Sequence, residues 1–209
     1  MLRYERQAWS AGSRRVAGVD EAGRGPLAGP VVAAAVVFPA DFLEAESGRS
    51  LAGLTDSKQL SESRRAHFFS LLMGLPAVLI GVGEADVGEI DRLNILRATH
   101  LAMARALSRI VPLPEHALVD GRPVPGLPCP STAIVNGDGL SLSIAAASVV
   151  AKVTRDRLMA ELDREFPQYG FARHKGYGTP EHLEALRKHG PTKHHRKSFE
   201  PVYQMNLDL

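Results

Sequence analysis

The feature that most constrains this chain is a short apolar run that ends in two adjacent carboxylates. Residues 16–19 read Val-Ala-Gly-Val, which favours a short buried strand, and Asp20 and Glu21 follow directly. The glycine-rich segment Gly23-Arg24-Gly25 comes next. Ionised carboxylates at the end of a buried strand are costly unless a positive charge compensates them, and a divalent metal ion does so while also supplying chemistry. A solvated turn is the alternative interpretation of the isolated pair.

Two later segments repeat the pattern of an apolar strand, an acid and a glycine. Residues 116–119 precede Asp120-Gly121, and residues 132–135 precede a turn that carries Asp138 between two glycines. Functional groups of an α/β sheet gather at strand ends, where glycine lets loops approach closely, so we expect these acids to converge on one site. Hard oxygen ligands without soft ones favour Mg²⁺ or Mn²⁺. Two such ions about 4 Å apart can promote phosphodiester hydrolysis.

The remaining apolar patterns predict an α/β protein. Apolar runs at residues 31–38 and 77–82 favour two further strands, of which the first forms a hairpin with the opening strand. Helical spacing predicts amphipathic helices after Ser61, which is a suitable N-cap, and over residues 94–110, 143–166 and 180–188. The expected irregular segments are residues 40–56 with a short helical piece, a polar link over residues 86–91, and a basic glycine-rich loop over residues 171–180.

The composition excludes several classes of protein. A length of 209 residues, with 44% hydrophobic and 23% charged residues, suits an ordinary globular domain with a small appendage. No apolar run could span a bilayer and no signal peptide is evident, so we expect a cytoplasmic protein without membrane contact. The single Cys129 excludes an internal disulfide. The net charge of +2 is too small to indicate nucleic-acid binding, although residues 187–197 are basic.

Two alternatives to a metal-dependent hydrolase follow from the residues. Residues 23–28 formally match a dinucleotide-binding fingerprint after a strand. That fingerprint needs a helix directly afterwards to hold the pyrophosphate, whereas Pro30 and residues 31–38 predict a strand. The principal alternative is a nucleic-acid-binding module without catalysis. Such a module would have no reason to retain all the acids.

Seven motifs follow one another along nearly the whole chain. They are Gly18-Val19-Asp20-Glu21-Ala22-Gly23-Arg24-Gly25, Asp56-Ser57-Lys58-Gln59-Leu60, Val119-Asp120-Gly121, Gly137-Asp138, Ala145-Ala146-Ala147-Ser148-Val149-Val150-Ala151-Lys152, His174-Lys175-Gly176-Tyr177-Gly178-Thr179 and His194-His195-Arg196-Lys197-Ser198-Phe199. Together they resemble bacterial ribonuclease HII, the type 2 ribonuclease H. The resemblance implies an RNase H-like fold over residues 1–166, with a central mixed sheet flanked by helices, and a small helical C-terminal extension over residues 167–209.

The resemblance also implies an activity and a cofactor. It implies a metal-dependent endoribonuclease that hydrolyses the RNA strand of RNA–DNA hybrids. Such an enzyme also cuts 5′ of single ribonucleotides embedded in duplex DNA and leaves a 3′-hydroxyl. The catalytic and metal-binding acids would be Asp20, Glu21, Asp120 and Asp138, with Mn²⁺ or Mg²⁺ as the cofactor.

The same resemblance implies substrate contacts. Gly23-Arg24-Gly25 would read the 2′-hydroxyl, because glycine lets main-chain N–H and C=O groups approach a sugar closely. Tyr177 would stack on the sugar after the ribonucleotide, and the alternative for this residue is an anchor in the core. The candidate phosphate contacts are Lys58, Lys152 and Lys175, for which simple surface charge is the alternative.

Strand geometry raises one difficulty for the opening acids. Successive side chains point to opposite faces, so Asp20 and Glu21 cannot both reach one metal centre in a regular strand, and we predict a strand break at Glu21. Asp156 lies four residues after Lys152, which favours an ion pair with it, and is left out of the site. We expect a monomer. Residues 203–209 are too weak a motif to claim a sliding-clamp partner.

Overall fold

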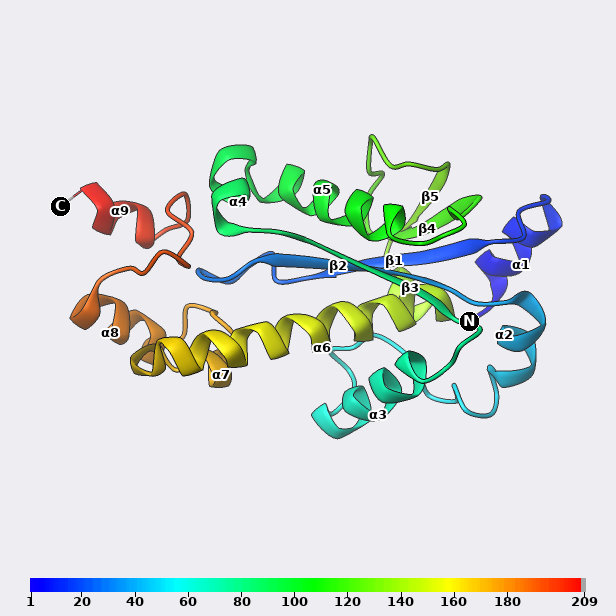
Figure 1. The fold of residues 1–209 in the computed structure, drawn as a ribbon, viewed down its shortest axis with the longest axis horizontal. Coiled ribbons are helices and arrows are strands. Elements are labelled where there is room, and N and C mark those ends of the chain that lie inside the picture. The colour runs from blue at the N-terminus through cyan, green and yellow to red at the C-terminus, as the bar shows by residue number, and fades with distance from the viewer. Residues whose placement is uncertain (208–209) are drawn as a thin grey trace.

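The computed structural model describes the backbone of residues 1–207 and the side chains as far as residue 204. Its strands form a five-stranded sheet in the order β3-β2-β1-β4-β5 (Figure 1). The central strand β1 (Val16–Ala22) is antiparallel to β2 (Val31–Val37) and parallel to β4 (His116–Asp120). The outer strands are β3 (Leu79–Ala85), antiparallel to β2, and β5 (Ser131–Ile134), parallel to β4. The predicted mixed sheet is confirmed.

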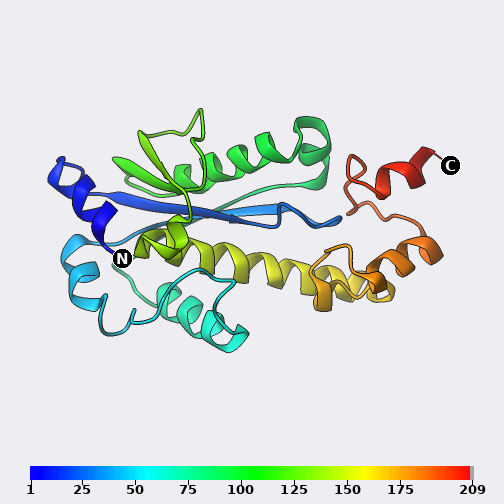
Figure 2. The same ribbon diagram turned by 180° about the vertical axis from the view of Figure 1, so that it is seen from behind.

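Two long helices cover the two faces of the sheet (Figures 1 and 2). Helix α6 (Leu142–Glu165) packs on β1 and β2 from one side, and α5 (Ile95–Ser108) packs on β3 and β2 from the other. Gly18 makes the contact with α6 close, because a Cβ there would lie 2.0 Å from the carbonyl carbon of Ser143. The remaining helices are α1 (Arg3–Ser10), α2 (Ala40–Glu46), α3 (Glu62–Met73), α4 (Val87–Leu93), η1 (Gly137–Gly139), η2 (Pro167–Tyr169), α7 (Phe171–His174), α8 (Pro180–His189) and α9 (Val202–Leu207).

The helix starts follow the capping residues that the sequence offers. The Ser61 hydroxyl accepts the amide hydrogen of Arg64 at 3.3 Å, which confirms the predicted N-cap of α3. Asn94 caps α5 in the same way, with 3.1 Å between its Oδ1 and the amide nitrogen of Arg97. Both contacts satisfy an amide that the first turn of a helix leaves without a partner.

Three local predictions are wrong. Strand β1 does not break at Glu21, because its ladder with β2 continues through the pairs Glu21–Ala33 and Ala22–Val32. The expected polar link over residues 86–91 contains the start of α4, which Asp86 and Glu89 stabilise through a reciprocal capping box. The expected loop over residues 171–180 begins with the short helix α7.

The C-terminal helices lie at one end of the molecule, opposite α1 and α2 (Figure 1). Helices α7 and α8 and the start of α9 bury a separate apolar cluster with the far end of α6 and with Leu27 of the β1–β2 turn. This arrangement fits the expected helical extension, while its boundary at residues 166 and 167 stays a prediction. None of the helices within residues 1–207 combines the length and apolar character needed to cross a membrane.

Candidate active site

Asp20 and Asp120 lie side by side because their strands are parallel neighbours. Val19 of β1 pairs with Val119 of β4, so the next residue of each strand reaches the same level of the sheet. Asp20 is 6% exposed, and its Oδ1 accepts the amide hydrogen of Glu21 at 2.7 Å. Oδ1 of Asp120 accepts the amide hydrogen of Gly137 at 2.7 Å, which ties the end of β4 to the turn η1 that carries Asp138.

Glu21 lies on the opposite face of β1 from Asp20, as strand alternation requires. Ala33, the partner of Glu21, belongs to the apolar cluster under α5, whereas Ala34, the partner of Asp20, belongs to the cluster under α6. The Glu21 side chain nevertheless opens into a cavity of about 480 Å³ that Asp120 also lines. The acids therefore come together across the end of the sheet without the predicted strand break.

The electrostatic field of these acids opposes their ionisation. Burial raises the pKa of Asp20 well above its usual range, and the charges of Glu21 and Asp120 raise it further. Burial also raises the pKa of Glu21, although the Arg24 guanidinium, 3.2 Å away, opposes that shift. Burial, followed by the charge of Asp120, raises the pKa of Asp138 to about 6. A bound cation would relieve this repulsion.

The donor set fits a hard divalent cation in its chemistry, because carboxylate oxygens are the ligands that Mg²⁺ and Mn²⁺ prefer. Within residues 1–207, no three His, Cys, Asp or Glu side chains are already arranged to hold a metal ion. Asp20 and Asp120 each accept a backbone amide, and Glu21 pairs with Arg24. Each of these contacts uses one carboxylate oxygen, so a metal site would require only that the remaining oxygens be brought together around the ion.

Lys58 faces the acid cluster from the turn before α3. Burial lowers the pKa of Lys58, but the charges of Asp20, Asp56, Asp138 and Asp120 together outweigh burial, so that its pKa is raised. An ammonium group held among carboxylates stays protonated at neutral pH. Lys58 therefore brings positive charge to the site where the sequence placed it.

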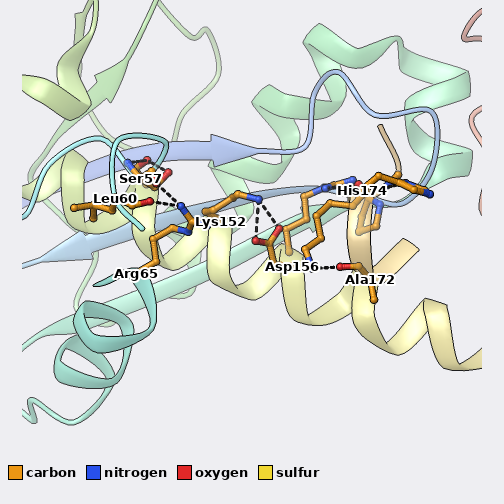
Figure 3. Close-up of polar contacts among 12 residues, drawn as sticks. Ser57, Leu60, Arg65, Lys152, Asp156, Ala172 and His174 are labelled. Atoms are coloured by element: carbon orange, nitrogen blue, oxygen red, sulfur yellow. Dashed lines mark hydrogen bonds and ion pairs between the residues drawn. The ribbon is translucent and has the colours of Figure 1, made fainter. Parts of the chain in front are cut away.

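Asp56 is a member of this cluster that sequence reasoning did not select. Its negative charge helps to raise the pKa of Asp138, and its Oδ1 accepts the Lys58 amide hydrogen at 2.9 Å. Arg65 of α3 holds the turn by donating to the carbonyl oxygens of Ser57 at 2.9 Å and Leu60 at 2.5 Å (Figure 3). The sequence signal that could have identified Asp56 is its place two residues before Lys58, directly ahead of the helix predicted after Ser61.

Gly23-Arg24-Gly25, the reading loop, follows the acids without interruption. Arg196 donates to the carbonyl oxygens of Gly23 at 2.5 Å and Arg24 at 2.8 Å, whereas no described residue bonds the amides of Arg24 and Gly25. The tyrosine loop, residues 175–179, lies against it, since a Cβ built on Gly25 would stand 3.5 Å from Cε1 of Tyr177. Tyr177 is 48% exposed, which excludes the core-anchor alternative.

Two buried arginines hold these loops, and sequence reasoning assigned this role to neither of them, although Arg196 belongs to the last of the seven motifs. Arg155 of α6 donates to the carbonyl oxygens of Pro30, Lys175 and Ala28 at 3.0 to 3.1 Å. Arg196 binds the reading loop and Gly29. Burial lowers the pKa of Arg155 to about 10 and that of Arg196 to about 9. Both guanidinium groups stay charged at neutral pH, and this charge strengthens their hydrogen bonds to the carbonyl oxygens.

The other candidate lysines have intramolecular partners. Nζ of Lys152 lies 2.6 and 2.8 Å from the carboxylate oxygens of Asp156, which confirms the expected ion pair (Figure 3). Lys175 has a left-handed backbone with φ of 53°, and its ammonium group donates to the carbonyl oxygen of Ala172. Phosphate contacts by these two lysines stay predictions.

The sequence model of ribonuclease HII matches residues 17–202. The ribonuclease HII of Geobacillus kaustophilus is 55% identical over 205 residues, which cover 98% of this chain and 75% of that protein. The crystal structure of ribonuclease H2 from Pyrococcus horikoshii superposes with a TM-score of 0.76 at 26% identity, covering 93% of this chain and 98% of that one.

A third similar protein is the RNase HII of Archaeoglobus fulgidus in its complex with PCNA, with a TM-score of 0.72 at 26% identity and coverage of 89% of this chain and 95% of that one. The mixed sheet between two helical layers thus defines a hydrolase of the ribonuclease H class. Within this class, the chain belongs to the ribonuclease HII family. It is an endonuclease that acts on the RNA of RNA–DNA hybrids.

Proposed function

We propose that this enzyme cuts on the 5′ side of single ribonucleotides embedded in duplex DNA and leaves a 3′-hydroxyl, in addition to cleaving longer hybrids. Asp20, Glu21, Asp120 and Asp138 hold Mn²⁺ or Mg²⁺ in this proposal, and a water molecule attacks the phosphodiester. The observation that carries it is the position of the Tyr177 ring. This ring is exposed and lies against Gly25, which belongs to the reading loop that follows the acids.

Recognition of the ribose follows from the state of the reading loop. Arg196 occupies the carbonyl oxygens of Gly23 and Arg24, while the amides of Arg24 and Gly25 have no partner among the described residues. A 2′-hydroxyl can accept from such amides, and a deoxyribose lacks the oxygen to do so. The Tyr177 ring would then meet the next sugar, where an additional hydroxyl would crowd it. The pair of contacts selects a junction from RNA to DNA.

The chemistry at the scissile phosphate depends on charge. Bound divalent ions supply activation of the attacking water and stabilisation of the leaving oxygen. Lys58 remains cationic among the acids and can bind a phosphate oxygen of the substrate. Asp56 restrains Lys58 through the hydrogen bond to its amide. Lys152 and Lys175 are proposed as weaker contacts farther along the same strand.

The proposal is tested with a DNA duplex that carries one ribonucleotide, incubated with Mg²⁺ or Mn²⁺ and separately with EDTA. We expect a metal-dependent nick on the 5′ side of the ribonucleotide, whose upstream end a DNA polymerase can extend because it carries a 3′-hydroxyl. Asp20→Asn should lower the rate by about 100-fold, as expected for loss of an electrostatic group at the reacting centre.

The matched control is Asp41→Asn, which removes an exposed carboxylate from α2, a helix that contributes no residue to the acid cluster. This variant should cut at the wild-type rate. A nick that persists in EDTA, or an Asp20→Asn enzyme as fast as Asp41→Asn, would refute the assignment of the acids. Saturable NAD(H) binding at micromolar concentration would instead revive a dinucleotide-dependent function.

The remaining attributes are part of the same proposal. The protein acts as a cytoplasmic monomer with a catalytic unit over residues 1–166. The known complex of the Archaeoglobus protein with PCNA makes a sliding clamp a reasonable partner to test. Residues 203–209 are too weak a motif to claim that contact, and they lie partly outside the described residues.

A further inference from the structure

Residues 194–196 connect the reading loop with the tyrosine loop. Arg196 binds the carbonyl oxygens of the reading loop, and the adjacent His195 is fully buried. Nε2 of His195 lies 3.0 Å from Nε2 of His182, and Nδ1 of His182 lies 2.9 Å from the carbonyl oxygen of Tyr177. Neither histidine takes part in the proposed phosphodiester chemistry. Their contacts end on the backbone of the residue that stacks on the substrate.

The contacts at the two ends determine which nitrogen of each ring carries the hydrogen. The amide N–H of Thr192 lies 2.9 Å from Nδ1 of His195, and an amide can only donate, so the hydrogen of His195 is on Nε2. That hydrogen points to Nε2 of His182, which must accept it, so the hydrogen of His182 is on Nδ1. Nδ1 of His182 then donates to the Tyr177 carbonyl. All three hydrogen bonds run in one direction, from Thr192 to Tyr177.

The surroundings keep both rings neutral and fixed. Both side chains are fully buried, and burial lowers the pKa of both rings, that of His195 to about 3. The ring of His174 stacks on that of His182 with 4.6 Å between centroids, and Tyr169 lies 5.1 Å from His195. An added proton would set two donors against each other, so the relay of hydrogen bonds holds only with neutral rings.

We propose that His182 and His195 are positioning residues that determine the preference for the RNA-to-DNA junction. Their one-directional relay fixes the Tyr177 backbone relative to residues 194–196, which hold the reading loop through Arg196. The relay thereby sets the distance between the amides of the reading loop, which contact the 2′-hydroxyl, and the Tyr177 ring, which contacts the next sugar. The inference rests on the proposed function of Tyr177, and it assigns the relay to substrate selection, with no part in the phosphodiester chemistry.

The test compares kcat/KM for a duplex with one ribonucleotide and for a uniform RNA–DNA hybrid. His182→Ala should lower the ratio of kcat/KM for the embedded ribonucleotide to kcat/KM for the uniform hybrid by about tenfold, which corresponds to the loss of one buried hydrogen bond. The kcat on the uniform hybrid should stay within about twofold of wild type. His182→Asn should restore most of the ratio, because its amide can still donate to the Tyr177 carbonyl. In a Tyr177→Ala background, His182→Ala should cause no further loss of the ratio, since the relay acts through Tyr177.

A second measurement needs no variant and no activity. Nitrogen chemical shifts of the histidine rings in the wild-type protein should show the Nε2–H form for His195 and the Nδ1–H form for His182. The opposite forms, equal losses on the two substrates, or additive losses in the double variant would overturn the relay. A wild-type enzyme without preference for the embedded ribonucleotide would refute the proposed function, and the chemical shifts would still decide whether the relay exists.

Discussion

The acids of the candidate site oppose the folding of the chain that carries them. Burial and like charges raise the pKa of Asp20, Glu21 and Asp138, so each ionised carboxylate costs free energy in the folded, metal-free protein at neutral pH. A cluster retained for stability would be neutral or paired with basic side chains. Only Glu21 has such an ion pair with Arg24 among these three. The need for a cation therefore explains the cluster better than packing does.

Asp138→Asn should stabilise the metal-free protein. In the folded protein the pKa of Asp138 is raised to about 6. The contribution of this carboxyl group to the free energy of unfolding is therefore complete below pH 3.8 and is lost as the pH rises through 6. At pH 7 in EDTA we expect a Tm about 2 °C above wild type, a small shift because solvent screens this half-exposed group. At pH 4 the two proteins should have nearly equal Tm. Calorimetry checks both values, with Asp41→Asn as the control.

The metal dependence of Tm completes this test. Mn²⁺ should raise the Tm of the wild type more than that of Asp138→Asn, because the variant has lost both a donor and part of the repulsion that the ion relieves. Equal increments in the two proteins would show that Asp138 lies outside the metal site.

At the scale of elements, the sequence predicted what local chemistry determines. Ser61 and Asn94 begin helices because their side chains accept amides of the same turn. The ladder of β1 past Glu21 could not be foreseen, since it depends on partners in β2 that hydrophobic periodicity does not reveal. The convergence of the acids was predictable because the strand, acid and glycine pattern recurs at neighbouring strands. Asp56 reaches the same cluster from a turn that no strand pattern marks.

The start of α6 gives a prediction about an element. Glu5 of α1 is fully buried, and its Oε1 accepts the Ser141 hydroxyl at 2.6 Å and the Ser143 amide at 3.0 Å. It therefore binds the N-terminus of the helix that packs on Gly18. Glu5→Ala should lower the free energy of unfolding by about 2–4 kcal/mol, because it leaves buried donors unsatisfied. Urea denaturation measures this loss.

The control for Glu5 is Glu44→Ala. Glu44 forms an exposed ion pair with Arg6 of the same helix α1, and its side chain is 48% exposed. An exposed pair contributes little, so this variant should lose less than about 1 kcal/mol. Similar losses for the two variants would mean that Glu5 acts as ordinary helix-surface charge.

At the scale of the whole molecule, long-range contacts join the two ends of the chain. Arg196 bonds carbonyl groups more than 160 residues earlier, and Arg155 joins two segments through the carbonyl groups of Ala28 and Pro30 and that of Lys175. Neither role has a local sequence signal, because a buried arginine among carbonyl groups has the same neighbours in sequence as a solvated one. The residues that we propose as substrate contacts could be predicted from sequence motifs. The residues that position them required the tertiary structure.

Two groups of titrating side chains give the whole molecule opposing responses to pH. Burial lowers the pKa of His174 and His182, and that of His195 from 6.5 to about 3. Their contribution to stability is therefore complete above pH 6.5 and is lost as the pH falls toward 3. The raised pKa values of Asp20 and Asp138 act in the other direction, since their contribution is lost as the pH rises. Within about pH 4 to 6.5 the two effects oppose each other.

A metal ion should therefore change the shape of the stability profile. In EDTA, we expect the free energy of unfolding to vary little between pH 4.5 and 6.5, because the acids offset the histidines. With saturating Mn²⁺ the repulsion among the acids is relieved, and the free energy should rise with pH by about 1.4 kcal/mol per pH unit for each histidine proton excluded on folding. Urea denaturation across this range, with and without Mn²⁺, measures both profiles. Parallel stability profiles with and without Mn²⁺ would show that the acids and Mn²⁺ are not coupled. A steeper profile with Mn²⁺ would place the metal at Asp20 and Asp138, the carboxylates whose pKa is raised.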